Sequence, residues 1–258
     1  MNKKYYFITG LPRSGTTLLS TILNQNPKFQ ASISGPLARF TRAIIEQSSA
    51  MSGYRHQCPS EKRKKIIQGV FDNYYDDPTK EVFFDTNRGW GLLTPFIKDL
   101  YPYTKLIMCV RDLNWVLDSF EQLYRKNPYD KNLMIPDEWA TTVYSRSDYL
   151  MQESSTVGFA YMALKQAITS DEKNMIMLVE YEQLCKNPEG MMKAIYNFID
   201  QPLYSHNFND VESSYDEFDD DVNIKGLHTT RKKIEWVERQ TILPPDIIHK
   251  FSGMEVWR

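Results

Sequence analysis

Short apolar runs alternate with longer segments of helical period along this chain. The clearest run is 105–110, and similar runs cover 5–9, 82–84 and 175–179. Runs of this length, apolar at consecutive positions, are typical of strands that are buried on both faces of a parallel sheet. Helical periods are clearest in Leu18–Leu23, Leu92–Leu100, Val116–Leu123, 155–169 and 189–199. Strands that alternate with helices predict an α/β fold, with a parallel sheet between two layers of helices.

The length of the chain fits one domain. With 258 residues and no repeat or linker, we expect a single domain over 1–258, in which 201–235 is an irregular, polar segment. In a sheet of this class, ligands bind outside the carboxyl ends of the strands. Polar side chains that directly follow the apolar runs are therefore the candidates for chemistry.

Charge and cysteine content limit the partners and the compartment. The net charge is −2, which implies no general attraction to nucleic acid or to a membrane surface. The three cysteines, Cys58, Cys109 and Cys185, are far apart, which favours a reducing compartment. The first run starts at residue 5, which leaves no room for a signal peptide, and no apolar stretch reaches membrane-spanning length. We therefore expect a cytoplasmic protein with no membrane or nucleic-acid partner, and composition leaves its oligomeric state open.

The turn after the first predicted strand has the frame of a phosphate-binding loop. Gly10 and Gly15 stand five positions apart, between the strand and the helix that begins with Thr16 and Thr17. The first N–H groups of such a helix point outward and attract an anion. The Lys of nucleoside-triphosphate enzymes is missing, because Thr16 takes its place and the loop cation is Arg13. The loop therefore suits an anion that is handled without a metal, and we expect no metal site.

The run Leu-Pro-Arg-Ser-Gly-Thr-Thr-Leu at 11–18 resembles the 5′-phosphosulfate loop of sulfotransferases, in the form found in tyrosylprotein sulfotransferases and bacterial relatives. The resemblance implies 3′-phosphoadenosine 5′-phosphosulfate (PAPS) as the sulfuryl donor and adenosine 3′,5′-bisphosphate (PAP) as the product. The residues that it implies at the 5′ end of the nucleotide are Arg13, Ser14, Gly15, Thr16, Thr17 and Leu18.

A second phosphate site follows the strand 105–110. Arg111 comes directly after this strand, and Ser119 lies eight positions later in the next helix. Arg provides a two-pronged donor for a phosphate, and Ser adds a neutral donor. The pair resembles the 3′-phosphate motif of the same family. Taken alone, Arg111 could instead pair with Asp112 or Asp118. Two phosphate sites fit a bisphosphorylated nucleotide better than ATP.

Weaker signals lie further along the chain. Tyr181 follows the predicted strand at 175–179 and begins the segment Tyr-Glu-x-Leu. This segment resembles one whose Tyr lies near the nucleotide in the family. An ordinary packing role for Tyr181 is equally open. A late Gly-containing basic loop closes over the 3′-phosphate in the family, and the resemblance transfers this role to Lys225 and Arg231. A basic surface run is the alternative.

The reacting centre is only partly predicted. Arg13 is the natural stabiliser of the leaving phosphate, because it lies in the loop that holds the 5′ end. The His and Glu bases of related enzymes have no counterpart at their usual places. Asp85 and Arg88, at the end of the run 82–84, are the candidates for proton acceptor and sulfuryl stabiliser, with a structural role for Asp85 left open. Of the four histidines, only His228 adjoins the basic loop. The acidic run 216–221 predicts a solvated loop, and the alternative is that it faces a cationic acceptor.

The predicted activity is transfer of a sulfuryl group from PAPS to a hydroxyl or amine acceptor. The acceptor class stays open among small molecules, glycans, lipids and peptides, because acceptor loops vary on a fixed donor site. Two other functions remain: a small-molecule kinase, which requires a metal, and a protein that binds PAP without turnover.

Overall fold

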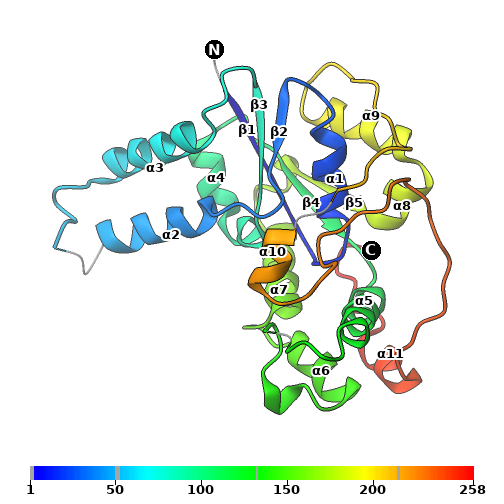
Figure 1. The fold of residues 1–258 in the computed structure, drawn as a ribbon. Helices are drawn as coiled ribbons and strands as arrows, with labels where there is room; N and C mark the ends of the chain where they lie inside the picture. The colour runs from blue at the N-terminus through cyan, green and yellow to red at the C-terminus, as the bar shows by residue number, and fades with distance from the viewer. Residues whose placement is uncertain (1–2, 50–52, 132, 214–215) are drawn as a thin grey trace.

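The fold is a five-stranded parallel sheet with helices on both faces, as the sequence predicts (Figure 1). This computed structural model describes residues 3–49, 53–131, 133–213 and 216–258, without the side chains of 216–218. The strand order is β2-β3-β1-β4-β5, so the first strand in the chain lies in the middle of the sheet. The two loops that follow β1 and β4 therefore lie side by side.

The elements have the following bounds. The strands are β1 Lys4–Gly10, β2 Phe29–Ala31, β3 Val82–Thr86, β4 Leu106–Val110 and β5 Ile176–Glu180. The helices are α1 Thr16–Leu23, α2 Leu37–Ser48, α3 Ser60–Tyr74, α4 Thr94–Leu100, α5 Leu113–Lys126, α6 Val143–Leu150, α7 Thr156–Ile168, α8 Tyr181–Lys186, α9 Pro188–Phe198, α10 Asp216–Asp221 and α11 Pro245–Phe251. Short 3₁₀ helices are η1 Arg88–Leu93, η2 Asp137–Trp139 and η3 Lys173–Met175.

Alternation along β1 divides the core into two layers. Tyr5 and Phe7 pack on one face of the sheet, in a cluster that includes side chains of α3, α4, α5 and α7. Tyr6 and Ile8 pack on the other face, with side chains of α1 and α9. A central strand that is apolar at consecutive positions thus fills both layers. The resulting three-layer arrangement is the predicted fold class.

Two features were not evident from the apolar pattern. The short strand β2 at the sheet edge has only three residues, too few to show a period. Strand β3 extends to Thr86, two residues beyond the apolar run, because Asp85 and Thr86 continue the pairing with β1. Asp85 therefore lies within the sheet and not in a loop beyond it.

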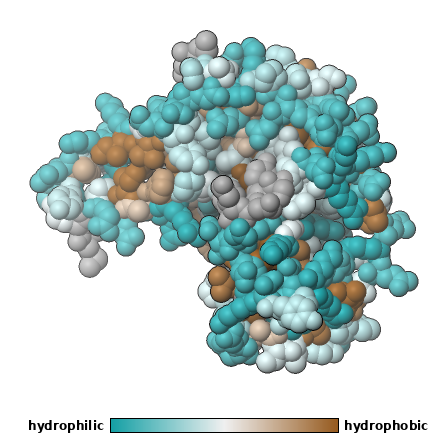
Figure 2. All heavy atoms as spheres, in the orientation of Figure 1, coloured by the Kyte–Doolittle hydropathy of each residue, from teal (hydrophilic) through white to brown (hydrophobic). Residues whose placement is uncertain are grey.

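Helices α2 and α3 project from the sheet as a long hairpin (Figure 1). Figure 2 shows hydrophobic side chains gathered on this hairpin, where Phe40 and Ile66 are substantially exposed. The segment after residue 201 contributes Val211, Ile224 and Leu227 to the core. Among the described residues, no helix combines the length and apolar character needed to cross a membrane.

Candidate active site

A cavity of about 1550 Å³ opens where β1, β3 and β4 end. Its walls come from the loop after β1, the start of α2, the segment after β3, the second half of α5, the start of α7 and the segment 221–239. Among its described lining residues, two are carboxylates, Asp221 and Glu235, and nine are cations. The cations are Arg13, Arg39, Arg42, Arg88, Arg111, Lys126, Arg231, Lys233 and Arg239. Such an excess of positive charge within low-dielectric walls concentrates anions.

The loop after β1 has the shape of an anion cradle. Gly10 has φ 143°, and a Cβ atom there would lie 2.1 Å from the carbonyl oxygen of Cys109, so a side chain is excluded. Gly15 has φ 93° and precedes α1, whose first turn no side chain caps. The first N–H groups of α1 belong to Thr16, Thr17 and Leu18 and have no partner within the helix. All three residues line the cavity. The loop can therefore hold a phosphate or a sulfate.

Ser14 holds the loop in shape and does not line the cavity. Its hydroxyl is fully buried and donates to the carbonyl oxygens of Leu11 at 2.6 Å and Cys109 at 2.9 Å. The Ser14 side chain therefore has a structural role, because both hydrogen bonds lead into the protein, and the contact of Ser14 with the nucleotide stays a prediction.

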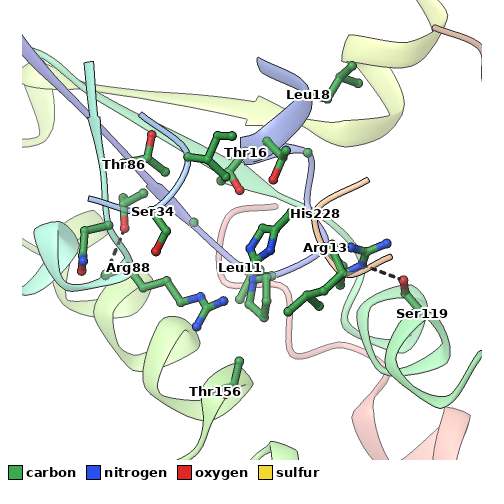
Figure 3. A pocket seen from close by; sticks show the side chains of 18 of the residues that line it. Leu11, Arg13, Thr16, Leu18, Ser34, Thr86, Arg88, Ser119, Thr156 and His228 are labelled. Atoms are coloured by element: carbon green, nitrogen blue, oxygen red, sulfur yellow. Dashed lines mark hydrogen bonds between the residues drawn. The ribbon is translucent and has the colours of Figure 1, made fainter. Parts of the chain in front are cut away.

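Arg13 links the two predicted phosphate sites. Its Nε donates to Ser119 Oγ at 3.0 Å (Figure 3). Its Nη1 donates to the carbonyl oxygen of Leu227. Arg111 in turn donates through Nη1 to the carbonyl oxygen of Arg13 at 3.0 Å. Burial and the neighbouring Arg111 lower the pKa of Arg13 to about 10, so it stays cationic at neutral pH. Two like charges held this close favour an anion between them.

Arg111 is poised to donate to a ligand. Its guanidinium stacks on the ring of Tyr181, 4.4 Å from the ring centroid, and its Nε is buried without a hydrogen-bond partner in the described part of the chain. Burial lowers its pKa. The carboxylates that could have paired with it are engaged elsewhere: Asp112 caps α5, and Asp118 pairs with Arg239. An orphaned buried donor of this kind points to a missing acceptor.

Tyr181 closes the side of the loop. A Cβ atom on Gly15 would lie 2.8 Å from Cδ2 of Tyr181, so the ring packs directly on the loop. Of the two late basic residues, Arg231 lines the cavity, whereas Lys225 is exposed and lies outside it. The structure thus brings Arg231, but not Lys225, to the cavity, and the contact of Lys225 with the nucleotide stays a prediction.

The structure places Asp85 outside the cavity and Arg88 on its wall. Asp85 is buried beneath Gly35, and its two oxygens accept hydrogen bonds from Tyr75 Oη and Trp90 Nε1, each at 2.7 Å. Burial raises its pKa to about 6, and it does not line the cavity. Arg88 does line the cavity and points into it (Figure 3), and burial lowers its pKa. The placement of Asp85 favours the structural alternative.

His228 and Asp219 form a pair that the sequence reading missed. Asp219 is 1% exposed, although the acidic run reads as a solvated loop. Its Oδ1 lies 2.8 Å from Nδ1 of His228, and its carboxylate also accepts from the N–H groups of Gly226 and His228. Only the position of His228 beside the basic loop hinted at a role. Arg39, Arg42 and Arg239 also line the cavity, and no motif marked them.

Comparison with known proteins agrees with this geometry. The family model described as "Sulfotransferase family" matches residues 6–205. Protein-tyrosine sulfotransferase A of Caenorhabditis elegans is 24% identical over 272 residues, covering 95% of this chain and 63% of that protein. A putative protein-tyrosine sulfotransferase of Caenorhabditis briggsae is 25% identical over 244 residues, covering 86% and 78%. The chain therefore spans somewhat less than two thirds of the C. elegans protein.

Two solved structures share the fold. The sulfotransferase domain from the curacin biosynthetic pathway superposes with a TM-score of 0.55 at 13% identity, covering 99% of this chain and 92% of that one. A sulfotransferase from Alicyclobacillus acidocaldarius superposes with a TM-score of 0.54 at 13% identity, covering 86% and 92%. At this identity, the likeness supports the fold alone.

The expected cytoplasmic location is wrong. The curated relatives are protein-tyrosine sulfotransferases, which act on secreted proteins in the Golgi. Three scattered cysteines and a net charge of −2 are compatible with more than one compartment, so composition could not decide the question.

Proposed function

The chain belongs to the sulfotransferase family, and from this premise we propose that it transfers a sulfuryl group from PAPS to a tyrosyl hydroxyl of a protein. The observation that carries the proposal is the joint placement of the 11–18 loop and of Arg111 with Ser119 on one cavity. The two anion sites fit a nucleotide that carries phosphate at both its 5′ and 3′ ends.

The donor site follows from the groups that lack partners. We propose that the first N–H groups of α1, with Thr16 and Thr17, hold the 5′-phosphosulfate. Arg111 supplies Nε, and Ser119 supplies its hydroxyl, to the 3′-phosphate. Tyr181 keeps the guanidinium of Arg111 in place, and Arg231 borders the same cavity.

The chemical step is an in-line displacement at sulfur. The bond from sulfur to the 5′-phosphate oxygen breaks as the acceptor oxygen bonds to sulfur, and PAP leaves with the electron pair. Negative charge grows on the leaving phosphate, where Arg13 stabilises it from the loop. We propose that Arg88, which points into the cavity, supports the oxygens of the transferring group. Arg13 remains cationic at neutral pH, because its pKa is lowered only to about 10.

Two observations favour a protein as the acceptor: the relatives are protein-tyrosine sulfotransferases, and the rim of the cavity carries exposed charged and apolar side chains. Arg39 and Arg42 are exposed on the first turns of α2 where it borders the cavity, and they favour acidic residues beside the acceptor. The neighbouring Phe40 is 47% exposed, and the hairpin carries the hydrophobic side chains visible in Figure 2. Exposed apolar surface next to a charged cavity is typical of a protein-binding face.

The test is transfer of radiolabelled sulfuryl from PAPS to a peptide with one Tyr flanked by acidic residues. Matched peptides replace that Tyr with Phe or Ser, or the acidic flanks with lysines. We expect label only on the tyrosyl peptides, with the lysine-flanked peptide the poorer acceptor. Label on the Ser peptide alone would contradict the acceptor class, and no label on any acceptor despite PAP binding would favour a non-catalytic binding protein.

A further inference from the structure

The donor site leaves the proton acceptor unassigned, and His228 is suited to that task among the described residues that line the cavity. A phenolic hydroxyl must lose its proton as the bond to sulfur forms. Asp85 is buried away from the cavity, and neither carboxylate that lines it, Asp221 or Glu235, is a buried, oriented group. His228 lines the cavity and is mostly shielded from solvent.

The pairing with Asp219 fixes the orientation and tautomer of His228. Because Asp219 Oδ1 lies 2.8 Å from Nδ1, the ring proton resides on Nδ1, and Nε2 is the basic nitrogen. Asp219 is itself held by the N–H groups of Gly226 and His228, so the carboxylate and the imidazole form one rigid unit. A buried carboxylate that orients a histidine in this way is a recurrent arrangement for proton transfer.

The surroundings of His228 match the proposed reaction centre. Figure 3 shows its ring between Arg13 and Arg88, below the loop that carries Thr16. Among the described residues, charged groups that act on it are Asp219 from α10, Arg13 from the loop and Arg88 from η1. Burial lowers the pKa of His228, Asp219 opposes this shift, and Arg88 and Arg13 add to it. The imidazole is therefore neutral at pH 7 and able to accept a proton.

We propose that His228, positioned by Asp219, is the general base that takes the proton of the acceptor hydroxyl. The proposal rests on the proposed sulfuryl transfer. The proton moves from the acceptor oxygen to Nε2, the acceptor oxygen bonds to sulfur, and the bond from sulfur to the 5′-phosphate breaks. The imidazolium that forms is stabilised by Asp219 and releases its proton to water after PAP departs.

The test compares His228→Gln with the parent chain on one acidic peptide whose acceptor is Tyr or a fluorinated Tyr of graded acidity. General-base catalysis contributes about 10²–10⁴-fold, so we expect His228→Gln to lose that much kcat on Tyr. The loss should shrink as the phenol becomes more acidic, and affinity for PAP should stay within about threefold of the parent. The matched control is His206→Gln, because His206 is a half-buried histidine outside the cavity that contacts Tyr196.

Two further variants separate catalysis from structure. Imidazole added to His228→Ala should restore turnover, which it cannot do for a structural defect. Asp219→Asn should lower kcat, and the double variant Asp219→Asn/His228→Gln should be no slower than His228→Gln alone, because the two residues act as one unit. Asp220→Asn, at the exposed neighbour on α10, is the control and should behave as the parent does.

The outcomes distinguish this proposal from the proposed function. A parent chain that neither binds PAP nor sulfates any tyrosyl peptide overturns the proposed function, and the role of His228 falls with it. An active parent with a His228→Gln variant that keeps turnover within threefold overturns the base alone. A loss that is equal for every fluorinated peptide and is matched by a loss of PAP affinity assigns His228 to nucleotide binding, and also overturns the proposal.

Discussion

Replacement of Arg111 by Ala should weaken binding of the 3′-phosphate and little else. In the parent, Nη1 is used on the carbonyl oxygen of Arg13 at 3.0 Å, and the buried Nε has no partner in the described part of the chain. A hydrogen bond to a charged group is worth about 1.5–3 kcal/mol, or about 10- to 100-fold in affinity. We expect Arg111→Ala to bind PAP that much more weakly, while its affinity for AMP, which lacks the 3′-phosphate, changes little.

The stability of the fold should not follow the loss of affinity. No ion pair of Arg111 occurs among the described residues, so the substitution leaves no carboxylate unpaired, and it removes a like charge next to Arg13. Titration calorimetry with PAP and AMP gives both affinities, and thermal unfolding gives the stability. The control is Arg125→Ala, because Arg125 lies on the far end of α5 with 53% of its side chain exposed. If Arg111→Ala discriminates PAP from AMP as strongly as the parent does, the reasoning about the 3′-site is refuted.

Three other substitutions test the remaining parts of the site. Arg13→Ala should lower kcat far more than PAP affinity, because its charge acts mainly on the transition state; equal losses in steady-state kinetics and calorimetry would contradict this. Ser14→Ala should cost about 1–3 kcal/mol in the free energy of unfolding, because two buried carbonyl oxygens lose a donor; an unchanged denaturation midpoint would contradict the structural role. Asp85→Asn should remove a pH dependence of stability. The pKa of Asp85 is raised from 3.8 to about 6, so the parent should lose about 3 kcal/mol as pH rises from about 4 through 6, and parallel stability curves for parent and variant would exclude this.

The donor half of the site could be predicted because its signals are local in sequence. The glycines at 10 and 15 and the helix start at Thr16 are neighbours in the chain, and so are the strand end at Arg111 and the helix that carries Ser119. A buried parallel sheet then brings the two segments together, because β1 and β4 pair directly. Fold and family are confirmed, whereas the roles of individual residues and the single domain over 1–258 remain predictions.

The proton acceptor could not be predicted, because it depends on which face of a strand a residue occupies and on a side-chain contact that no motif marks. Strand β3 continues to Thr86, so Asp85 shares the face of Phe83 and points into the core. Asp219 lies on the short helix α10 and His228 in the irregular segment after it, and no periodic pattern in the sequence predicts their contact. A run of acidic residues predicts a solvated segment, so the sequence gives no sign that one member of the run, Asp219, is buried.

The central claim, that the cavity binds a nucleotide with phosphates at both ends, is tested most directly by the thermal stability of the parent chain with PAP in the absence of Mg²⁺. At about 100-fold excess over the dissociation constant, PAP should stabilise the fold by about 2.7 kcal/mol, a rise in Tm of about 5–10 °C. AMP should give a smaller rise, and added Mg²⁺ should change neither. No shift with PAP, or a shift only with ATP and Mg²⁺, would contradict the claim.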